Sequence, residues 1–115
     1  MKKLLVTLFI SFLFCNLGHA QSSLPECAGS PFEVKKFSLT GGGLATKAKM
    51  LAIWRDCFGT LINKDGSKYV GEFQRGKFSG QGTFTWGDGE FAGDKYIGEF
   101  FKGKRSGLGT YTFSN

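Results

Sequence analysis

The sequence predicts a mainly all-β fold: an antiparallel β-meander of hairpin repeats, with five or six strands and a short helical or irregular N-terminal cap. Glycine and phenylalanine account for 18 and 13 of the 115 residues and proline for only 2, which favours turn-rich β structure over a helical bundle. Several short runs alternate aromatic and polar residues, the period of a half-buried strand. One phrase of 18 residues is written twice, and such self-similarity indicates an array of one small structural unit.

The first twenty residues, 1–20, are predicted to be a secretory signal peptide. Lys2 and Lys3 form a positive start, an apolar run follows over Leu4–Cys15, and Gly18–Ala20 offers the small residues that a signal peptidase reads. The apolar run is too short to span a membrane comfortably. We therefore expect an exported protein, periplasmic or secreted, whose mature chain starts at Gln21.

Removal of this segment limits the chemistry of the mature chain. His19 is the only histidine, so its loss excludes Ser-His-Asp and Cys-His catalysis and removes the commonest zinc ligand. The formal charge falls from +6 to +4, with 13 Lys and Arg against 9 Asp and Glu. We expect no enzyme, no catalytic residue, no cofactor and no metal site, and at this modest charge no nucleic-acid partner.

Two cysteines remain in the mature chain, and an exporting compartment permits disulfides. Cys27 and Cys57 are therefore predicted to form a bridge. Closing a loop of that length stabilises a protein by about 3–4 kcal/mol in the chain-entropy interpretation.

Residues 21–56 are predicted to form an N-terminal cap on the repeat array. The stretch begins turn-rich, Phe32–Leu39 is a candidate short strand, and residues 44–55 are the one good helix candidate, with apolar residues at helical spacing. Because the end units of an array must cover its exposed core, we expect this segment to cover the aromatic end of the sheet through Leu51, Ile53 and Trp54.

Residues 57–115 carry the repeats: a half repeat over 57–68 and full repeats over 69–95 and 96–115. Each full copy reads as a hairpin, in which a strand with alternating aromatics, a short glycine-containing turn and a second strand follow one another. The side chains expected in the core share one face of these strands and are Tyr69, Phe73, Phe84, Trp86, Tyr96, Phe100, Tyr111 and Phe113.

The phrase Tyr-x-Gly-Glu-Phe-x-x-Gly-Lys-x-x-Gly-x-Gly-Thr, which begins at Tyr69 and again at Tyr96, resembles the MORN (membrane occupation and recognition nexus) repeat. The resemblance implies a sheet of hairpins used for binding or scaffolding, in contact with membrane lipid or in protein assembly. The chain departs from the family at one point. Tyr69 and Tyr96 lie 27 residues apart, about four more than the family's repeat, and the extra residues fall in Trp86–Asp94.

Basic residues recur at the predicted hairpin turns, where Arg75 and Lys77 match Lys102 and Lys104 of the next copy, and Arg105 adds one more charge. Neighbouring hairpins lie roughly 10 Å apart, so the turns are expected to form a row of positive charge along one rim. Such a row suits an anionic membrane surface or a protein partner. Turns kept soluble by lysine are the simpler interpretation.

Several alternatives remain open. Exposed aromatics such as Phe78, Trp86 or Phe91 would suit a carbohydrate-binding module, and the repeats are also compatible with an accessory part of a larger enzyme.

The acidic residues of the inserted stretch Trp86–Asp94 resemble those of a calcium loop, but Ala92 stands where a ligand is needed. The uncharged edge strand Thr110–Phe113 invites pairing with another strand, so we expect either self-association there or a chain that is a fragment of a longer array.

Overall fold

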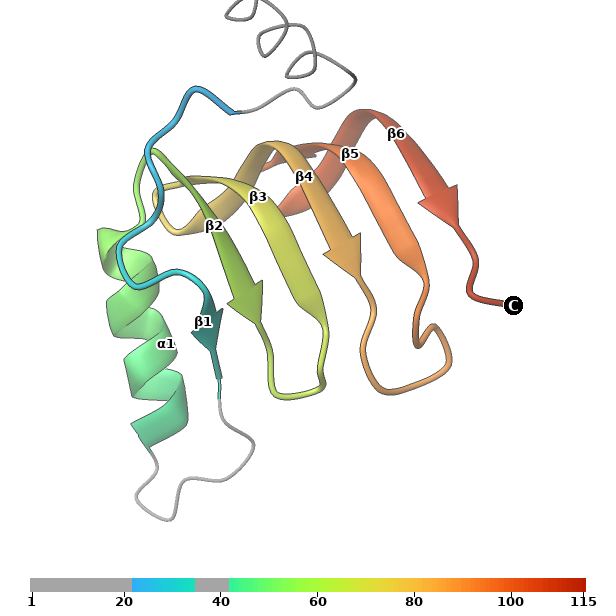
Figure 1. Cartoon of the computed structure of the whole chain (residues 1–115), viewed down its shortest axis with the longest axis horizontal. Coiled ribbons are helices and arrows are strands. Elements are labelled where there is room, and N and C mark those ends of the chain that lie inside the picture. The colour runs from blue at the N-terminus through green and yellow to red at the C-terminus, as the bar shows by residue number, and fades with distance from the viewer. Residues whose placement is uncertain (1–21, 35–41) are drawn as a thin grey trace, which may run out of the picture.

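The computed structural model describes residues 22–34 and 42–115, and the predicted signal peptide, with Cys15 and His19, lies outside them. One sheet of six strands, ordered β1 to β6, forms the body of the chain (Figure 1). The elements are β1 (Phe32–Glu33), α1 (Gly42–Ile53), β2 (Cys57–Ile62), β3 (Lys68–Gln74), β4 (Lys77–Thr85), β5 (Lys95–Phe101) and β6 (Lys104–Thr112). The prediction of a mainly β meander is confirmed.

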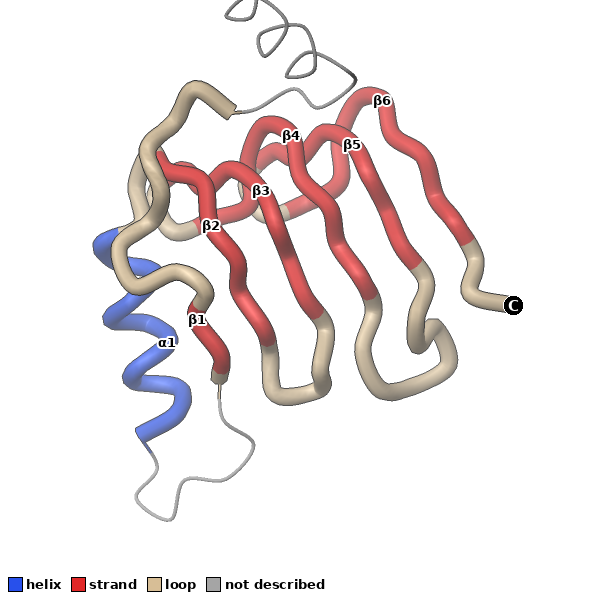
Figure 2. Tube along the Cα trace, viewed as in Figure 1, coloured by secondary structure: helices blue, strands red, loops and turns tan. Residues whose placement is uncertain are grey.

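The meander is antiparallel from β2 to β6, where each strand pairs with the next one along the chain (Figure 2). The first strand departs from this rule. β1 pairs in parallel with β2, with Phe32 opposite Leu61. A parallel neighbour needs a crossover connection, and the segment that contains α1 supplies it. Only Phe32–Glu33 of the predicted strand Phe32–Leu39 is strand, and residues 35–39 lie outside the described part.

Helix α1 begins and ends two residues earlier than the predicted range 44–55. The residue that follows it, Trp54, turns into the core. Its side chain is fully buried, and its indole Nε1–H donates to the carbonyl oxygen of Ala28 at 2.7 Å. The prediction was wrong for Ile53, which is 60% exposed because it lies on the outer side of the last helical turn. Within residues 22–34 and 42–115, no helix is long and apolar enough to cross a bilayer.

The tyrosines of the two repeats lie over glycines of the neighbouring strand. A Cβ on Gly82 would stand 2.5 Å from ring atoms of Tyr69, and Tyr96 covers Gly109 in the same way. Only a residue without a side chain permits this approach. The hydroxyl group of each tyrosine is also fixed by a hydrogen bond to the backbone. The Tyr69 hydroxyl lies 2.7 Å from the carbonyl oxygen of Glu72, to which it donates. The repeated glycines therefore make space for the repeated rings.

The aromatic core runs along one face of the sheet as a chain of edge-to-face contacts. Tyr69 meets Phe73 and Phe100, each with ring centroids 5.1 Å apart, and Phe78 stacks flat on Tyr69 at 3.9 Å. Burial of each ring stabilises the fold by about 1.5–3 kcal/mol. Of the eight predicted core aromatics, Tyr69, Phe73, Tyr96 and Phe100 are buried, while Phe84, Trp86 and Tyr111 are partly buried against them.

Phe113 corrects the prediction for this core. It is 76% exposed, although its position in the repeat matches that of Trp86. The reason is its place in the sheet. Trp86 follows an inner strand and contacts Tyr111 at a centroid distance of 5.1 Å, whereas Phe113 follows β6, whose outer side pairs with no described strand.

The extra residues between the two full repeats, in Trp86–Asp94, do not disturb the pairing of the strands. They form a loop between β4 and β5 that is closed by two backbone hydrogen bonds, from Trp86 N–H to the Asp94 oxygen and from Gly93 N–H to the Trp86 oxygen, both at 2.9 Å. Thr85 therefore still faces Lys95, and the strand pairing continues without interruption.

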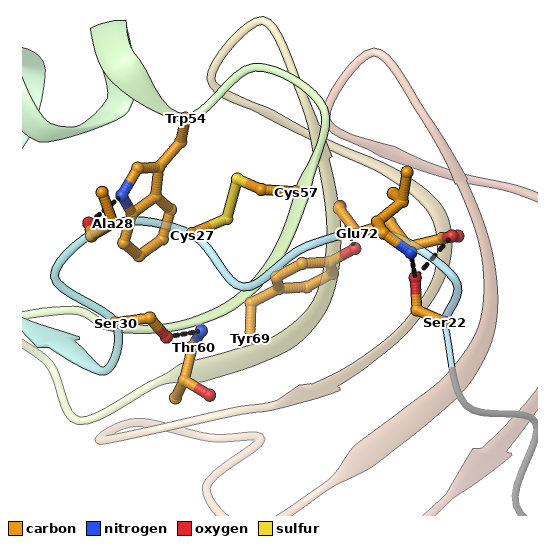
Figure 3. Close-up of a disulfide and its surroundings, with 10 residues drawn as sticks. Ser22, Cys27, Ala28, Ser30, Trp54, Cys57, Thr60, Tyr69 and Glu72 are labelled. Carbon is orange, nitrogen blue, oxygen red and sulfur yellow. Dashed lines mark hydrogen bonds between the residues drawn. A yellow bond between two sulfur atoms is a disulfide. The ribbon is translucent and has the colours of Figure 1, made fainter.

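The disulfide between Cys27 and Cys57 ties the N-terminal segment to the start of β2, with a Cα–Cα distance of 4.9 Å (Figure 3). Backbone hydrogen bonds reinforce the link, since Cys27 N–H donates to the Phe58 oxygen and Phe58 N–H to the Pro25 oxygen, each at 2.8 Å. The side chain of Ser30 also accepts from Thr60 N–H at 2.9 Å. The segment is thereby fixed across the first strand of the array.

Candidate functional site

All five predicted basic residues lie at one end of the sheet, in or next to the turns that join β3 to β4 and β5 to β6. The pairing of Gln74 with Lys77 and of Phe101 with Lys104 places the two turns at residues 75–76 and 102–103. The side chains of this set are all exposed: Arg75, Lys77, Lys102, Lys104 and Arg105. The predicted row of charge along one rim is therefore present in the fold.

Both turns are two-residue hairpin turns with positive φ at both central residues. The φ angles are 51° and 75° at Arg75 and Gly76, and 49° and 83° at Lys102 and Gly103. This is the turn that matches the twist of paired strands, and its second position suits glycine. Because the first position is a cation in both copies, the turn geometry points a basic residue outward at the same place in each repeat.

A sixth cation, Arg55, joins this rim, and the repeat pattern does not reveal it. Its carbonyl oxygen accepts from Arg75 N–H at 3.1 Å, so the exposed Arg55 lies directly beside the first turn. Arg55 precedes the repeats, and only the packing of the α1 end against the turn brings it there. We call the six exposed cations the basic rim: Arg55, Arg75, Lys77, Lys102, Lys104 and Arg105.

An aromatic groove of about 520 Å³ lies next to the basic rim. Four aromatic residues line it, together with a glycine of the second turn and the two basic residues at the start of β6. The full lining is Phe78, Phe84, Trp86, Phe100, Gly103, Lys104 and Arg105. The guanidinium of Arg105 lies 5.6 Å from the Trp86 ring centroid and 5.7 Å from that of Tyr96. These are cation–π distances, so the charge lies over the rings while the side chain as a whole remains exposed.

Arg105 takes the position in the second repeat that Phe78 has in the first. Phe78 stacks on Tyr69, and Arg105 lies over Tyr96, the tyrosine of the next copy. A planar guanidinium can replace an aromatic ring in such a stack. The second repeat therefore has one additional positive charge, which lies on the aromatic face.

The three aromatics considered for sugar stacking do not lie together. Phe78 and Trp86 both line the groove, but one face of Phe78 is taken by Tyr69. Phe91 is 52% exposed and belongs to the loop between β4 and β5, at the opposite end of the strands from the turns. A sugar site on the groove would therefore depend on Trp86.

The repeated glutamates have structural partners. Glu72 accepts from Gln81 N–H at 2.5 Å, and Glu99 accepts from Leu108 N–H at 2.6 Å. Both bonds span the irregularity where β4 or β6 shifts register against its neighbour. The two carboxylates thus satisfy backbone donors at equivalent bulges.

The hydroxyl of Tyr69 lies in the core. Its burial is the main cause that raises its pKa well above the usual value, and this keeps the phenol neutral.

Asp94, in the loop that resembles a calcium loop, accepts hydrogen bonds from Tyr111 and Ser114. Its Oδ2 accepts from the Tyr111 hydroxyl at 2.6 Å, and its Oδ1 accepts from Ser114 N–H at 2.8 Å. These hydrogen bonds, with that of Tyr111 first, lower the pKa of Asp94, while the bond to Asp94 raises the pKa of Tyr111. In the part of the chain that the structure describes, no three His, Cys, Asp or Glu side chains gather as a metal site.

Comparison with known families agrees with the repeat geometry. Residues 69–91 and 96–115 match the family model of the MORN repeat. No curated protein matches the chain. Each matched stretch begins at the strand that carries the tyrosine and contains one of the two basic turns. MORN repeats generally serve in binding or scaffolding and are typically not enzymes. The chain therefore contains two MORN repeats, over residues 69–91 and 96–115.

Proposed function

We propose that this chain is an exported, non-catalytic attachment module that binds an anionic membrane surface through the basic rim. One observation carries the proposal: six exposed cations gather at one end of the sheet, and two of them occupy the same turn position in successive repeats. Asp56 is the one acidic residue within 55–57, 74–77 and 101–105, and the exposed Glu26, whose strand position pairs with Phe58, is a second acidic residue next to this end. The local charge is therefore strongly positive.

The strength of such attachment follows from simple electrostatics. Each lysine or arginine close to an anionic leaflet contributes about 1 kcal/mol, and the attraction decays within a Debye length of about 8 Å at physiological salt. A rim of six charges in and next to two neighbouring turns can bring several of them within that distance of a flat surface at once. The resulting binding should be weak to moderate and strongly dependent on salt.

An exposed aromatic accompanies the charges. Phe101 is 58% exposed, and the Lys102 ammonium lies 5.2 Å from its ring centroid. Aromatic side chains favour the interface between water and lipid, where a ring beside a cation can contact both head groups and the upper acyl region. Phe101 is therefore the apolar contact that we expect beside the basic rim.

Flotation with vesicles tests the proposal. We would use the 115-residue chain, expressed with its first twenty residues so that any processing takes place, and vesicles of pure phosphatidylcholine or with added phosphatidylserine. Binding to the anionic vesicles alone, with release at high salt, is the expected result. The triple variant Lys77→Glu, Lys102→Glu and Lys104→Glu should abolish it.

A matched variant controls for net charge. Lys64, Lys68 and Lys95 are also exposed, but they lie at the opposite end of the strands. The variant Lys64→Glu, Lys68→Glu and Lys95→Glu changes the total charge by the same amount and should retain binding. Equal loss in both variants would show that only net charge matters. Absence of flotation under all conditions would redirect the search to a protein partner.

The aromatic groove supports a second candidate, a carbohydrate site. Its volume of about 520 Å³ and its rings suit stacking against a sugar ring. Such binding should persist at high salt and should be lost in Trp86→Ala, with retained far-UV circular dichroism as the control for folding. A glycan array probed with the full chain provides the measurement, and an array without hits would remove this candidate.

A further inference from the structure

We propose that β6 pairs with β6 of a second copy of the chain, antiparallel and with Gly109 opposite Gly109, to form a symmetric dimer. Among the described residues, the two sides of the sheet differ. On one side β1 and the bridge from Glu26 to Phe58 pair with β2, whereas β6 is an edge whose outer side no described strand occupies (Figure 1). The proposal concerns self-association and does not rest on membrane binding.

The glycines identify which backbone groups of β6 face outward. A Cβ on Gly98 would stand 2.5 Å from the Cα of Gly109, which is the close approach of a non-hydrogen-bonded pair. The N–H and C=O of Gly109 therefore point away from β5, to the open side. Gly71 and Gly82 show the same close approach one repeat earlier, and the outward groups of Gly82 are used there by Gly98 of β5. Gly109 has the same outward groups, and no strand in the described part of the chain pairs with them.

This pattern selects the register. In the pairing of β4 with β5, Gly82 faces Gly98 and Gly80 faces Phe100. Placing Gly109 opposite Gly109 of the second copy repeats the glycine pair. It also sets Gly107 opposite Tyr111 of the second copy, an aromatic residue that faces this glycine as Phe100 faces Gly80. A two-fold axis through the glycine pair creates both contacts twice, as a closed dimer requires.

A hollow at the edge is the place that this contact would cover. It has a volume of about 440 Å³ and is lined by Tyr96, Arg105, Ser106, Gly107 and Gly109. In the proposed register Phe113 of the second copy lies opposite Arg105. Phe113 is largely exposed, and the Arg105 guanidinium already lies over aromatic rings. The dimer would bury the phenylalanine and add it to this cation–π group.

The charges of the two copies are complementary in this arrangement. Antiparallel pairing lays the turn at Lys102–Lys104 of one copy beside the loop between β4 and β5 of the other, which contains Asp88, Glu90 and Asp94. The link is close because Lys104 lies opposite Ser114, whose N–H donates to Asp94. The two Arg105 side chains are separated by eight strand positions, about 26 Å, which exceeds the Debye length.

Sedimentation equilibrium of the full chain tests the proposal, and Phe113→Lys is the decisive variant. It sets a lysine opposite Arg105 at two symmetric places, so the dimer dissociation constant should rise at least tenfold. Phe101→Lys is the matched control, because Phe101 is similarly exposed but lies on β5, away from the edge. It should leave the dissociation constant unchanged.

A charge swap then tests the register itself. Adding Arg105→Glu to Phe113→Lys sets opposite charges face to face and should restore the dimer. A chain that stays monomeric at about 1 mM would overturn the proposal. A dimer that is unaffected by Phe113→Lys, or that the double variant does not restore, would also overturn it, because the two copies would then meet elsewhere or in another register. Circular dichroism of each variant verifies the fold.

Discussion

Trp54 packs edge-to-face on Phe73 at a centroid distance of 4.8 Å, in the relation that Phe78 has to Phe100 one repeat later at 5.9 Å. The backbone repeats the relation as well. Gly76 N–H donates to the Trp54 oxygen at 2.7 Å, and Gly103 N–H to the Phe78 oxygen at 3.0 Å. A residue outside the repeats therefore takes the place of a preceding repeat, and in this way the array is capped.

The first prediction concerns this cap. Trp54→Ala should lower the free energy of unfolding by about 3–5 kcal/mol, because it removes a fully buried ring and leaves a cavity against Phe73. Trp54→Phe keeps a ring but loses the hydrogen bond to Ala28, and it should have a smaller effect. Urea denaturation measures both. Equal effects in the two variants would show that the ring contact is not the main contribution.

The second prediction concerns the disulfide. Reduction should lower the free energy of unfolding by about 3–4 kcal/mol, since the bridge between Cys27 and Cys57 closes a loop with a sequence separation of 30. The double variant Cys27→Ser and Cys57→Ser should show the same loss and should not respond to reductant. Denaturation with and without dithiothreitol checks this, and a reductant effect that persists in the variant would contradict it.

The third prediction is a loss of stability at alkaline pH. Burial raises the pKa of the Tyr69 hydroxyl, so the stability that this neutral phenol contributes is complete below its unfolded value near pH 10 and is lost as the pH rises above it. The free energy of unfolding, measured in urea from pH 8 to 11, should fall at the upper end. Tyr69→Phe has no proton to lose there, and its decline should be shallower than that of the unmodified chain.

The fourth prediction is a matching loss in acid. The pKa of Asp94 is lowered, so the stability that its carboxylate contributes is present above the unfolded value near 3.8 and is lost as the pH falls through the folded value. Asp94→Asn should reduce the slope of stability between pH 2 and 5. Some slope should remain, because hydrogen bonds from Ser67 also lower the pKa of Asp65. An unchanged slope would show that Asp94 does not couple to folding.

Local pattern was sufficient to predict the hairpins and the basic turns. Strand faces follow from alternation of period two, and a turn of two residues follows from its glycine, so both can be inferred from neighbouring positions alone. The cysteine pair was predictable because only two cysteines remain after the expected cleavage. The exposure of Phe113 at the sheet edge was not predictable in this way. Phe113 and Trp86 have the same repeat position, and only the sheet order distinguishes them.

The sequence by itself determined the repeating unit: the tyrosine that covers a glycine, the glutamate at the bulge and the cation at the turn, all of which depend on residues a few positions apart or in the adjoining strand of one hairpin. The tertiary structure alone decided what lies at the two ends. It placed Trp54 in the position of a missing ring, brought Arg55 to the basic rim, made β1 a parallel neighbour and left β6 as an open edge. These outcomes depend on contacts between distant segments, whose free energies no local pattern in the sequence encodes.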